Sequence, residues 1–183
     1  MLKINEEVKD FAKEMDGIHI KRWKELPEFD LYATQIVDII ESELYFLKVF
    51  DREIITKSMI NNYVKHEIIP RPQNKKYTRL AVACLMVVSI LKQFMEISDI
   101  AQGIKLQTKI LGTEAAYDKF CEEMERSIHL VFKNFIDGDY PMDIRIENVD
   151  IDSINLTLAT MSIASKMLIK KLIEANGLLI KEG

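Results

Sequence analysis

Residues 56–79 concentrate the basic and amide side chains of this chain that could bind a polyanion. The segment holds six basic residues and one acidic residue, a formal charge of +5, within a chain of net charge −4. The preceding segment, residues 25–55, has a formal charge of −6. A basic island in an acidic protein is typical of a surface that binds nucleic acid or another polyanion. The alternative is a lysine-rich loop that is simply solvated.

Helical spacing separates the apolar and polar residues of this basic segment. Thr56 is a favourable N-cap, and Met59, Ile60 and Tyr63 fall on one face of the helix that would follow it. The opposite face carries amides and lysines, which can bond to base edges in the major groove or to phosphates. We therefore predict a recognition helix over residues 57–66. Its candidate DNA contacts are Lys57, Ser58, Asn61, Asn62 and Lys65.

The residues after this helix predict a short basic wing over residues 70–79. Pro70 and Pro72 lack a backbone donor and clash with a preceding helical turn, so they end the helix. Residues 73–78 then read as a polar turn. The candidate DNA contacts of the wing are Arg71, Lys75, Lys76, Tyr77 and Arg79.

The stretch INNYVKHEIIPRPQNKKYTR, followed by an apolar helix and then ISDI, resembles the winged helix-turn-helix of MerR-type bacterial regulators. By this resemblance, Lys75 stands at the arginine of the family's R-x-Y wing element and Tyr77 at its tyrosine. Two positions depart from the family pattern. Asn61 replaces an arginine of the recognition helix, so the family's base preference does not transfer. Glu67 replaces a glycine just after the helix. Because glycine is the usual left-handed residue at that position, we expect this helix to end differently from the family's recognition helix.

Three further stretches, LPEFDLY, ITKSMINNYVK and KKYT, more closely resemble the uncharacterised bacterial family catalogued as domain of unknown function 1836. That family is regarded as a candidate DNA-binding family. The resemblance covers residues 26–112 and is strongest over residues 56–78. It implies a DNA-binding domain in the front half of the chain.

Helical periodicity dominates the remainder of the front half. It predicts an amphipathic first helix that Gly17 closes and a second helix that Asp30 caps. The continuous apolar run over residues 80–91 predicts a central core helix. A further helix is expected to start with Ser98 as its cap and to end near Gly112.

Two series of mostly apolar residues at alternating spacings of four and three predict a pair of C-terminal helices suited to left-handed packing. The first is Tyr117, Cys121, Met124, Ile128, Val131 and Phe135, and the second is Ile154, Leu158, Met161, Ser165, Leu168 and Leu172. We expect the two helices to pair within one chain and a homodimer to form across a remaining apolar face. Between them, the alternation of Met142, Ile144 and Ile146 could be a strand or a packed loop.

No motif of a catalytic, metal or cofactor site is evident, and we predict a protein that is not an enzyme and has no metal or cofactor. Cys84 and Cys121 sit singly in apolar helical patterns, which indicates buried structural thiols. No signal peptide is evident at the start, and the longest apolar run is too short to span a bilayer. We therefore expect a cytoplasmic protein that does not enter a membrane.

The sequence as a whole predicts an all-α protein with a small β-wing. Residues 1–112 would hold an N-terminal helix and a MerR-like winged helix-turn-helix, and residues 113–183 a helical domain for dimerisation or packing. The predicted function is sequence-selective binding of double-stranded DNA by a transcriptional regulator. The alternative is a non-enzymatic helical interaction module that uses the basic face on an acidic protein partner. The sequence does not identify an effector ligand.

Overall fold

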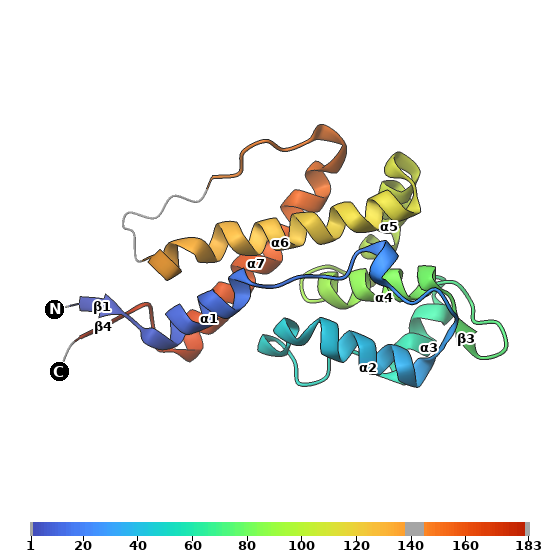
Figure 1. Cartoon of the computed structure of the whole chain (residues 1–183), viewed down its shortest axis with the longest axis horizontal. Coiled ribbons are helices and arrows are strands. Elements are labelled where there is room, and N and C mark those ends of the chain that lie inside the picture. The colour runs from blue at the N-terminus through green and yellow to red at the C-terminus, as the bar shows by residue number, and fades with distance from the viewer. Residues whose placement is uncertain (1, 138–144, 182–183) are drawn as a thin grey trace. The chain divides into compact units, whose positions relative to one another are not determined.

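A computed structural model describes residues 2–137 and 145–181 and shows a mostly helical protein with a small antiparallel sheet, as predicted (Figure 1). A further two-stranded sheet, β1 with β4, was not predicted. The helices are α1 (Glu6–Asp16), α2 (Ala33–Glu43), α3 (Lys57–Lys65), α4 (Arg79–Leu91), α5 (Ile97–Leu111), α6 (Thr113–Asp137) and α7 (Ile154–Glu174). Short 3-10 turns are η1 (Trp23–Glu25), η2 (Tyr45–Val49) and η3 (Ile151–Ser153). The strands are β1 (Leu2–Ile4), β2 (Leu31–Tyr32), β3 (Lys76–Tyr77) and β4 (Leu179–Lys181).

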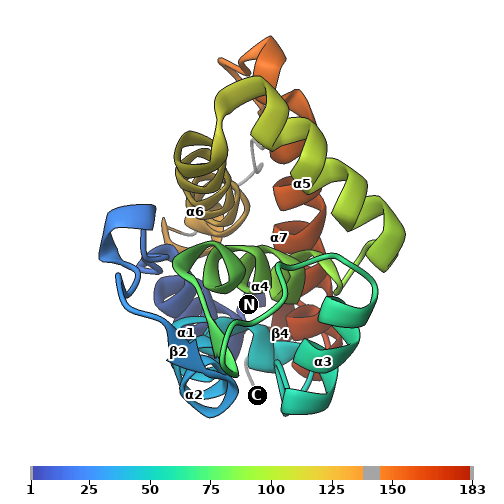
Figure 2. The same ribbon diagram turned by 90° about the vertical axis from the view of Figure 1, so that its right-hand side faces the viewer.

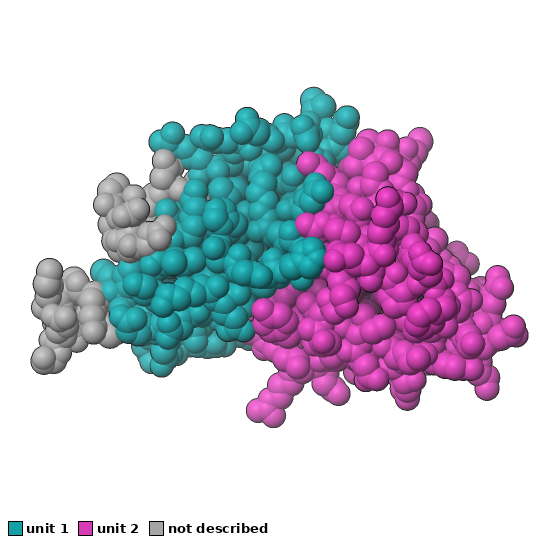
Figure 3. All heavy atoms as spheres, in the orientation of Figure 1, with its two compact units in different colours: residues 1–19, 122–183 teal, residues 20–121 magenta. Residues whose placement is uncertain are grey.

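The chain divides into two compact units (Figure 3). Unit 1 consists of residues 1–19 and 122–183, and unit 2 of residues 20–121. Unit 1 is therefore built from both ends of the chain, whereas unit 2 is one continuous segment. The domains proposed from the sequence, residues 1–112 and 113–183, grouped the first helix with the front half and stay a prediction.

Helix α4 forms the core of unit 2. Its sequence is apolar on every side, and such a helix is stable only where it is covered all round. Residues 81–91 are accordingly all buried, as the apolar run over residues 80–91 predicted, except that its first residue, Leu80, is 37% exposed. Helices α2 and α5 and strand β3 contact it. Figure 2 shows α4 behind the segment that leads from α3 to β3.

A small sheet ties the chain before α2 to the chain after α3. Strand β2 pairs antiparallel with β3, with Leu31 opposite Tyr77 and Tyr32 opposite Lys76. The prediction that Asp30 caps α2 was wrong, because this pairing holds the next two residues in a strand. The helix instead starts after Tyr32, whose backbone N–H donates to Gln35 Oε1 at 2.9 Å.

Helix α5 ends as predicted but starts earlier than predicted. It terminates at Gly112, whose φ of 83° is a left-handed conformation that suits glycine. Its N-cap is Glu96 rather than Ser98, so the cap prediction was wrong by two residues. The side chain of Glu96 makes no capping hydrogen bond, which explains why the cap left no signal in the sequence.

Unit 1 contains α1, the larger part of α6, and α7. All of the apolar series predicted for α6 is buried, and its last four residues, Met124, Ile128, Val131 and Phe135, belong to unit 1. The series predicted for α7 was wrong at its start, because Ile154 is 48% and Leu158 is 56% exposed. The buried face of α7 instead includes Leu156, Thr160 and Ile163.

Hydrogen bonds explain this change of face on α7. Thr160 Oγ1 lies 2.8 Å from Ser127 Oγ on α6, and Thr157 Oγ1 donates to Glu123 Oε2 at 2.7 Å. Buried hydroxyls and carboxylates need such partners. The face of α7 that carries Thr157 and Thr160 is therefore the one that packs against α6. The two helices thus do contact each other within the chain, as predicted, but through a seam that is partly polar.

The two ends of the described chain meet in unit 1. Strand β1 pairs antiparallel with β4, and Asn5 Nδ2 donates to Ala175 O at 2.9 Å. The rings of Phe11 on α1 and Phe132 on α6 meet edge to face, with centroids 5.6 Å apart. The alternation of Met142, Ile144 and Ile146 lies largely outside the described residues, and no strand is assigned to its last member, Ile146.

Candidate nucleic-acid interface

Helix α3 presents one polar face to solvent. Thr56 caps it as predicted, since Thr56 Oγ1 accepts a hydrogen bond from Met59 N at 3.2 Å. Ile60 and Tyr63 are buried on the inner face. The exposed residues are those predicted from the sequence: Lys57, Ser58, Asn61, Asn62 and Lys65. No acidic residue occurs within the helix, so its outer face is cationic.

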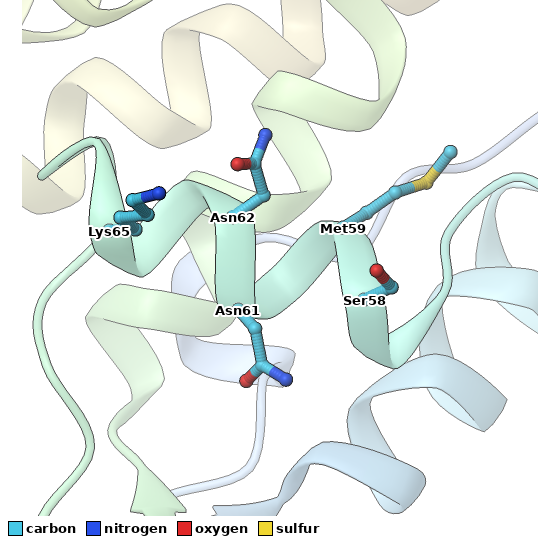
Figure 4. A pocket seen from close by; sticks show the side chains of 5 residues that line it. All are labelled: Ser58, Met59, Asn61, Asn62 and Lys65. Carbon is cyan, nitrogen blue, oxygen red and sulfur yellow. The ribbon is translucent and has the colours of Figure 1, made fainter.

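A shallow hollow of about 360 Å³ lies along this face and is lined by Ser58, Met59, Asn61, Asn62 and Lys65. Figure 4 shows that the amides of Asn61 and Asn62 point to opposite sides of the helix. Each side-chain amide offers both donors and an acceptor. The helix can therefore offer hydrogen bonds in two directions to a partner that lies along it.

The end of α3 places Glu67 in a left-handed conformation with φ 56°. Ile68 N donates to Tyr63 O at 3.0 Å and Glu67 N to Val64 O at 3.1 Å. This pair of bonds is the Schellman motif, the helix end that usually uses glycine. The prediction of a different helix end was wrong, because Glu67 adopts the glycine conformation.

The predicted wing contains a two-residue hairpin. Gln73 and Lys76 exchange two backbone hydrogen bonds of 2.9 Å each. Between them, Asn74 has φ 50° and Lys75 has φ 64°. Two successive positive φ angles define a type I′ turn, for which Asn-Gly is the favoured sequence. Lys75 therefore occupies the position where glycine is preferred, and its side chain is exposed at the tip.

The two residues after the turn have different surroundings. Lys76 is half-buried, and its Nζ lies 5.2 Å from the centre of the Tyr32 ring. Tyr77 is only 5% exposed, and burial raises the pKa of its hydroxyl. Tyr77 thus packs the base of the wing, whereas Lys75 and part of Lys76 face solvent.

Arg79 is held by the chain before α2. Its Nη2 lies 3.1 Å from Glu28 Oε1, its Nε donates to Pro27 O at 3.4 Å, and its guanidinium lies 5.7 Å from the Trp23 ring. Its side chain is only 18% exposed. Arg71, by contrast, is exposed, with Glu67 Oε1 4.0 Å from its Nη2. The predicted site residues therefore split into an exposed set and a supporting pair, Tyr77 and Arg79.

Sequence reasoning missed two residues that position α3. Glu41 on α2 and Lys92 after α4 both bind the backbone of the connection that leads into α3. The available signal was Lys92 itself, a lone charge directly after an apolar helix. Its partners lie far away in sequence, so local patterns did not reveal them.

We compared the sequence with known protein families, with curated proteins and with solved structures. A family model described as a domain of unknown function, DUF1836, matches residues 21–120, more than half of the chain. The chain belongs to the DUF1836 family. No curated protein and no solved structure matches it. The DUF1836 match nearly coincides with unit 2, so the family's domain contains α3 and the hairpin.

Both cysteines are buried free thiols, as predicted, and burial raises the pKa of Cys84 to about 11. Within residues 2–137 and 145–181, no group of three or more His, Cys, Asp or Glu side chains could hold a metal ion. None of the helices in the described part of the chain is long and apolar enough to cross a bilayer.

Proposed function

We propose that this DUF1836 protein is a transcriptional regulator that binds double-stranded DNA sequence-selectively, with α3 as its recognition helix. The observation that carries the proposal is the outer face of α3, which holds lysines and amides and no acid. An α-helix fits the major groove, where amides can bond to adenine and lysines to guanine or phosphate.

The order of elements supports a winged helix-turn-helix of MerR-like type. Helix α2 contacts α3, and the hairpin that follows α3 pairs through β3 with the strand before α2. The connection from α2 to α3, residues 44–56, is longer than the short turn usual in this motif and contains η2.

The conformation of Lys75 is a second support. A left-handed non-glycine residue is strained by about 1 kcal/mol, and residues strained in this way are concentrated at functional sites. A cation at a hairpin tip can reach a DNA phosphate. In this proposal Lys57, Lys65, Lys75 and Lys76, together with Arg71, bind phosphates, whereas Tyr77 and Arg79 support the wing.

We further propose that the protein acts as a homodimer through its C-terminal helices. Helix α7 leaves apolar side chains in solvent, with Leu158 and Ile169 each 56% and Ile173 72% exposed. A single helix reads few base pairs, and dimers read two half-sites. The proposal implies a cytoplasmic, non-enzymatic protein.

A second candidate function is binding of an acidic protein partner through the same cations. It is favoured by two exposed aromatic residues, Phe29 at 69% and Tyr32 at 49%, because aromatic residues are enriched in protein interfaces. Tyr32 also contacts Lys76 of the wing.

Selection of bound duplexes from a random DNA pool, followed by titration over a range of salt concentrations, tests the DNA proposal. Replacement of Lys57, Lys65 and Lys75 by glutamine should reduce the salt slope by roughly three units, one per phosphate contact. The matched control replaces three lysines outside α3 and the wing by glutamine: Lys9 and Lys13 on α1 and Lys24 on η1. Equal slopes for the two triple variants, or no enrichment from the pool, would favour the protein partner.

A further inference from the structure

A second concave surface of unit 2 lies between the end of α3, α4 and α5. We call it the α4–α5 groove. Its volume is about 630 Å³, within the range of about 300–1,000 Å³ that is common for small-molecule sites. Apolar side chains contribute much of the lining: Val64, Ile68, Ile69, Leu80 and Ile104, with Cys84 beside them.

The rim of the groove is cationic. Arg71, Lys105 and Lys109 line it together with one acid, Glu67. The raised pKa of Cys84, about 11, keeps that thiol neutral at physiological pH. The groove therefore combines an apolar floor with a net positive rim, which is complementary to a ligand with an apolar body and an anionic head.

Of the two lysines of α5, the fold explains Lys109 but not Lys105. Lys105 and Lys109 are both exposed, and their spacing puts two like charges about one helical turn apart, where they repel each other. Neither forms an ion pair with a carboxylate of the described residues. Lys109 lies in the last turn, where a cation complements the helix dipole. Lys105 has no such role, and an anion bound between the two would relieve their repulsion.

We propose that the α4–α5 groove binds a small anionic amphiphile, with its apolar chain on the floor and its carboxylate between Lys105 and Lys109. The groove is also lined by the last turn of α3 and by Glu67, from which the chain continues to the wing. A ligand there contacts the segment that fixes the end of the recognition helix. It therefore serves as an effector of DNA binding, a part of the proposal that rests on the proposed function.

Calorimetric titration of the full chain with decanoate, below its micellar concentration, tests the site. We expect saturable binding of one decanoate per chain and displacement of the anionic fluorophore anilinonaphthalene sulfonate. Decanol has the same chain length without the charge and should bind at least tenfold more weakly. The double variant Lys105→Gln/Lys109→Gln should lose about tenfold in decanoate affinity, and its melting temperature should change little because both side chains are exposed.

Two further variants separate the groove from the DNA face. Thr108→Trp, which fills the groove, should abolish decanoate binding, whereas Lys57→Gln/Lys65→Gln should weaken DNA binding and leave decanoate affinity unchanged. Equal affinity for decanoate and decanol, an unaltered affinity in the Lys105/Lys109 variant, or binding of an acidic peptide only would overturn the proposal. If the protein binds decanoate but no DNA, the ligand site is supported and its proposed role as an effector site is refuted.

Discussion

Glu41 on α2 and Lys92, directly after α4, bind the same residue of the connection before α3, Ile54. Glu41 Oε1 accepts hydrogen bonds from Ile54 N at 2.6 Å and from Ile55 N at 3.2 Å. Lys92 Nζ donates to Ile54 O at 2.6 Å. The start of α3 is thus fixed by α2 on one side and by the end of α4 on the other.

Replacement of Lys92 by methionine should therefore destabilise the connection before α3. It removes the donor to Ile54 O, and a buried acceptor left without a partner costs about 1–3 kcal/mol. We expect urea denaturation to show a loss of this size. The control Lys48→Met removes an exposed lysine near the same carboxylate and should change stability little.

The same lysine gives a pH dependence. Burial lowers the pKa of Lys92, and the nearby Asp51 and Glu41 only partly oppose this. The unfolded chain thus holds this proton to higher pH than the folded chain does. As pH rises from the lowered pKa towards 10.5, the wild type should gain stability relative to Lys92→Met. If the free energies of unfolding of the two proteins change in parallel over this pH range, the pKa of Lys92 is not lowered by folding.

Glu67→Gly should stabilise the protein. Glycine adopts the left-handed conformation at the end of α3 without the strain of a side chain, a gain of about 1 kcal/mol. The ion pair between Glu67 and Arg71 is exposed and 4.0 Å long, so its loss should offset little of the gain in stability. Thermal melting should show an increase of a few degrees, whereas Glu67→Ala, which keeps a Cβ, should show none.

Lys75→Gly should raise stability and lower DNA affinity at the same time. Asn-Gly is the favoured sequence for the type I′ turn, so glycine relieves the strain at φ 64°. The variant also loses one proposed phosphate contact, and the salt slope should fall by about one unit. Lys75→Ala serves as the control, since it removes the charge but retains the strain. A variant that melts higher and binds DNA as the wild type does would exclude Lys75 from the interface.

Asn61→Ala and Asn62→Ala should each reduce discrimination between DNA sites by about 1–3 kcal/mol for each bidentate pair lost. Nonspecific affinity should change less, because neither side chain is charged. Both residues are exposed, so melting temperatures should stay close to that of the wild type. Because the two amides point to opposite sides, the variants should lose discrimination at different base positions. A fall in melting temperature that parallels the loss of selectivity would instead indicate a structural role.

The exposed apolar face of α7 gives a prediction about assembly. Leu158→Asp/Ile173→Asp should dissociate the proposed homodimer into folded monomers, since both side chains are exposed within the chain. Ile128→Asp should instead unfold unit 1, because Ile128 is 1% exposed and a buried charge is strongly destabilising. Analytical ultracentrifugation and circular dichroism separate the two outcomes. A wild type that sediments as a monomer at high concentration would refute the dimer.

Local signals predicted much of the proposed site from the sequence. The Thr56 cap, the polar face of α3 and the core helix α4 each depend on residues within one or two turns, and all three are confirmed. The resemblance to domain of unknown function 1836 is confirmed as well, by the match over residues 21–120, whereas the resemblance to MerR-type regulators stays a prediction. Local spacing is sufficient where a helix has one clear apolar side or is apolar throughout.

The failures have a common cause in contacts between distant residues. Spacing placed Ile154 and Leu158 inside, but the partners of Thr157 and Thr160 lie on α6, and those hydrogen bonds set the buried face. Asp30 was predicted to cap α2, but the two residues after it pair with β3 as a strand, and the helix begins only after them. Glu67 kept the glycine conformation because the backbone bonds that end α3 outweigh the strain of one side chain.

The pairing of β1 with β4 also orders events during synthesis of the chain. Unit 1 needs α7 and β4, which leave the ribosome after everything else in the described chain. Unit 2 is continuous and is complete some sixty residues earlier, so it can fold while the rest is still being made. A nascent chain therefore carries its proposed DNA-reading helix before it carries the helix proposed to bring two copies together.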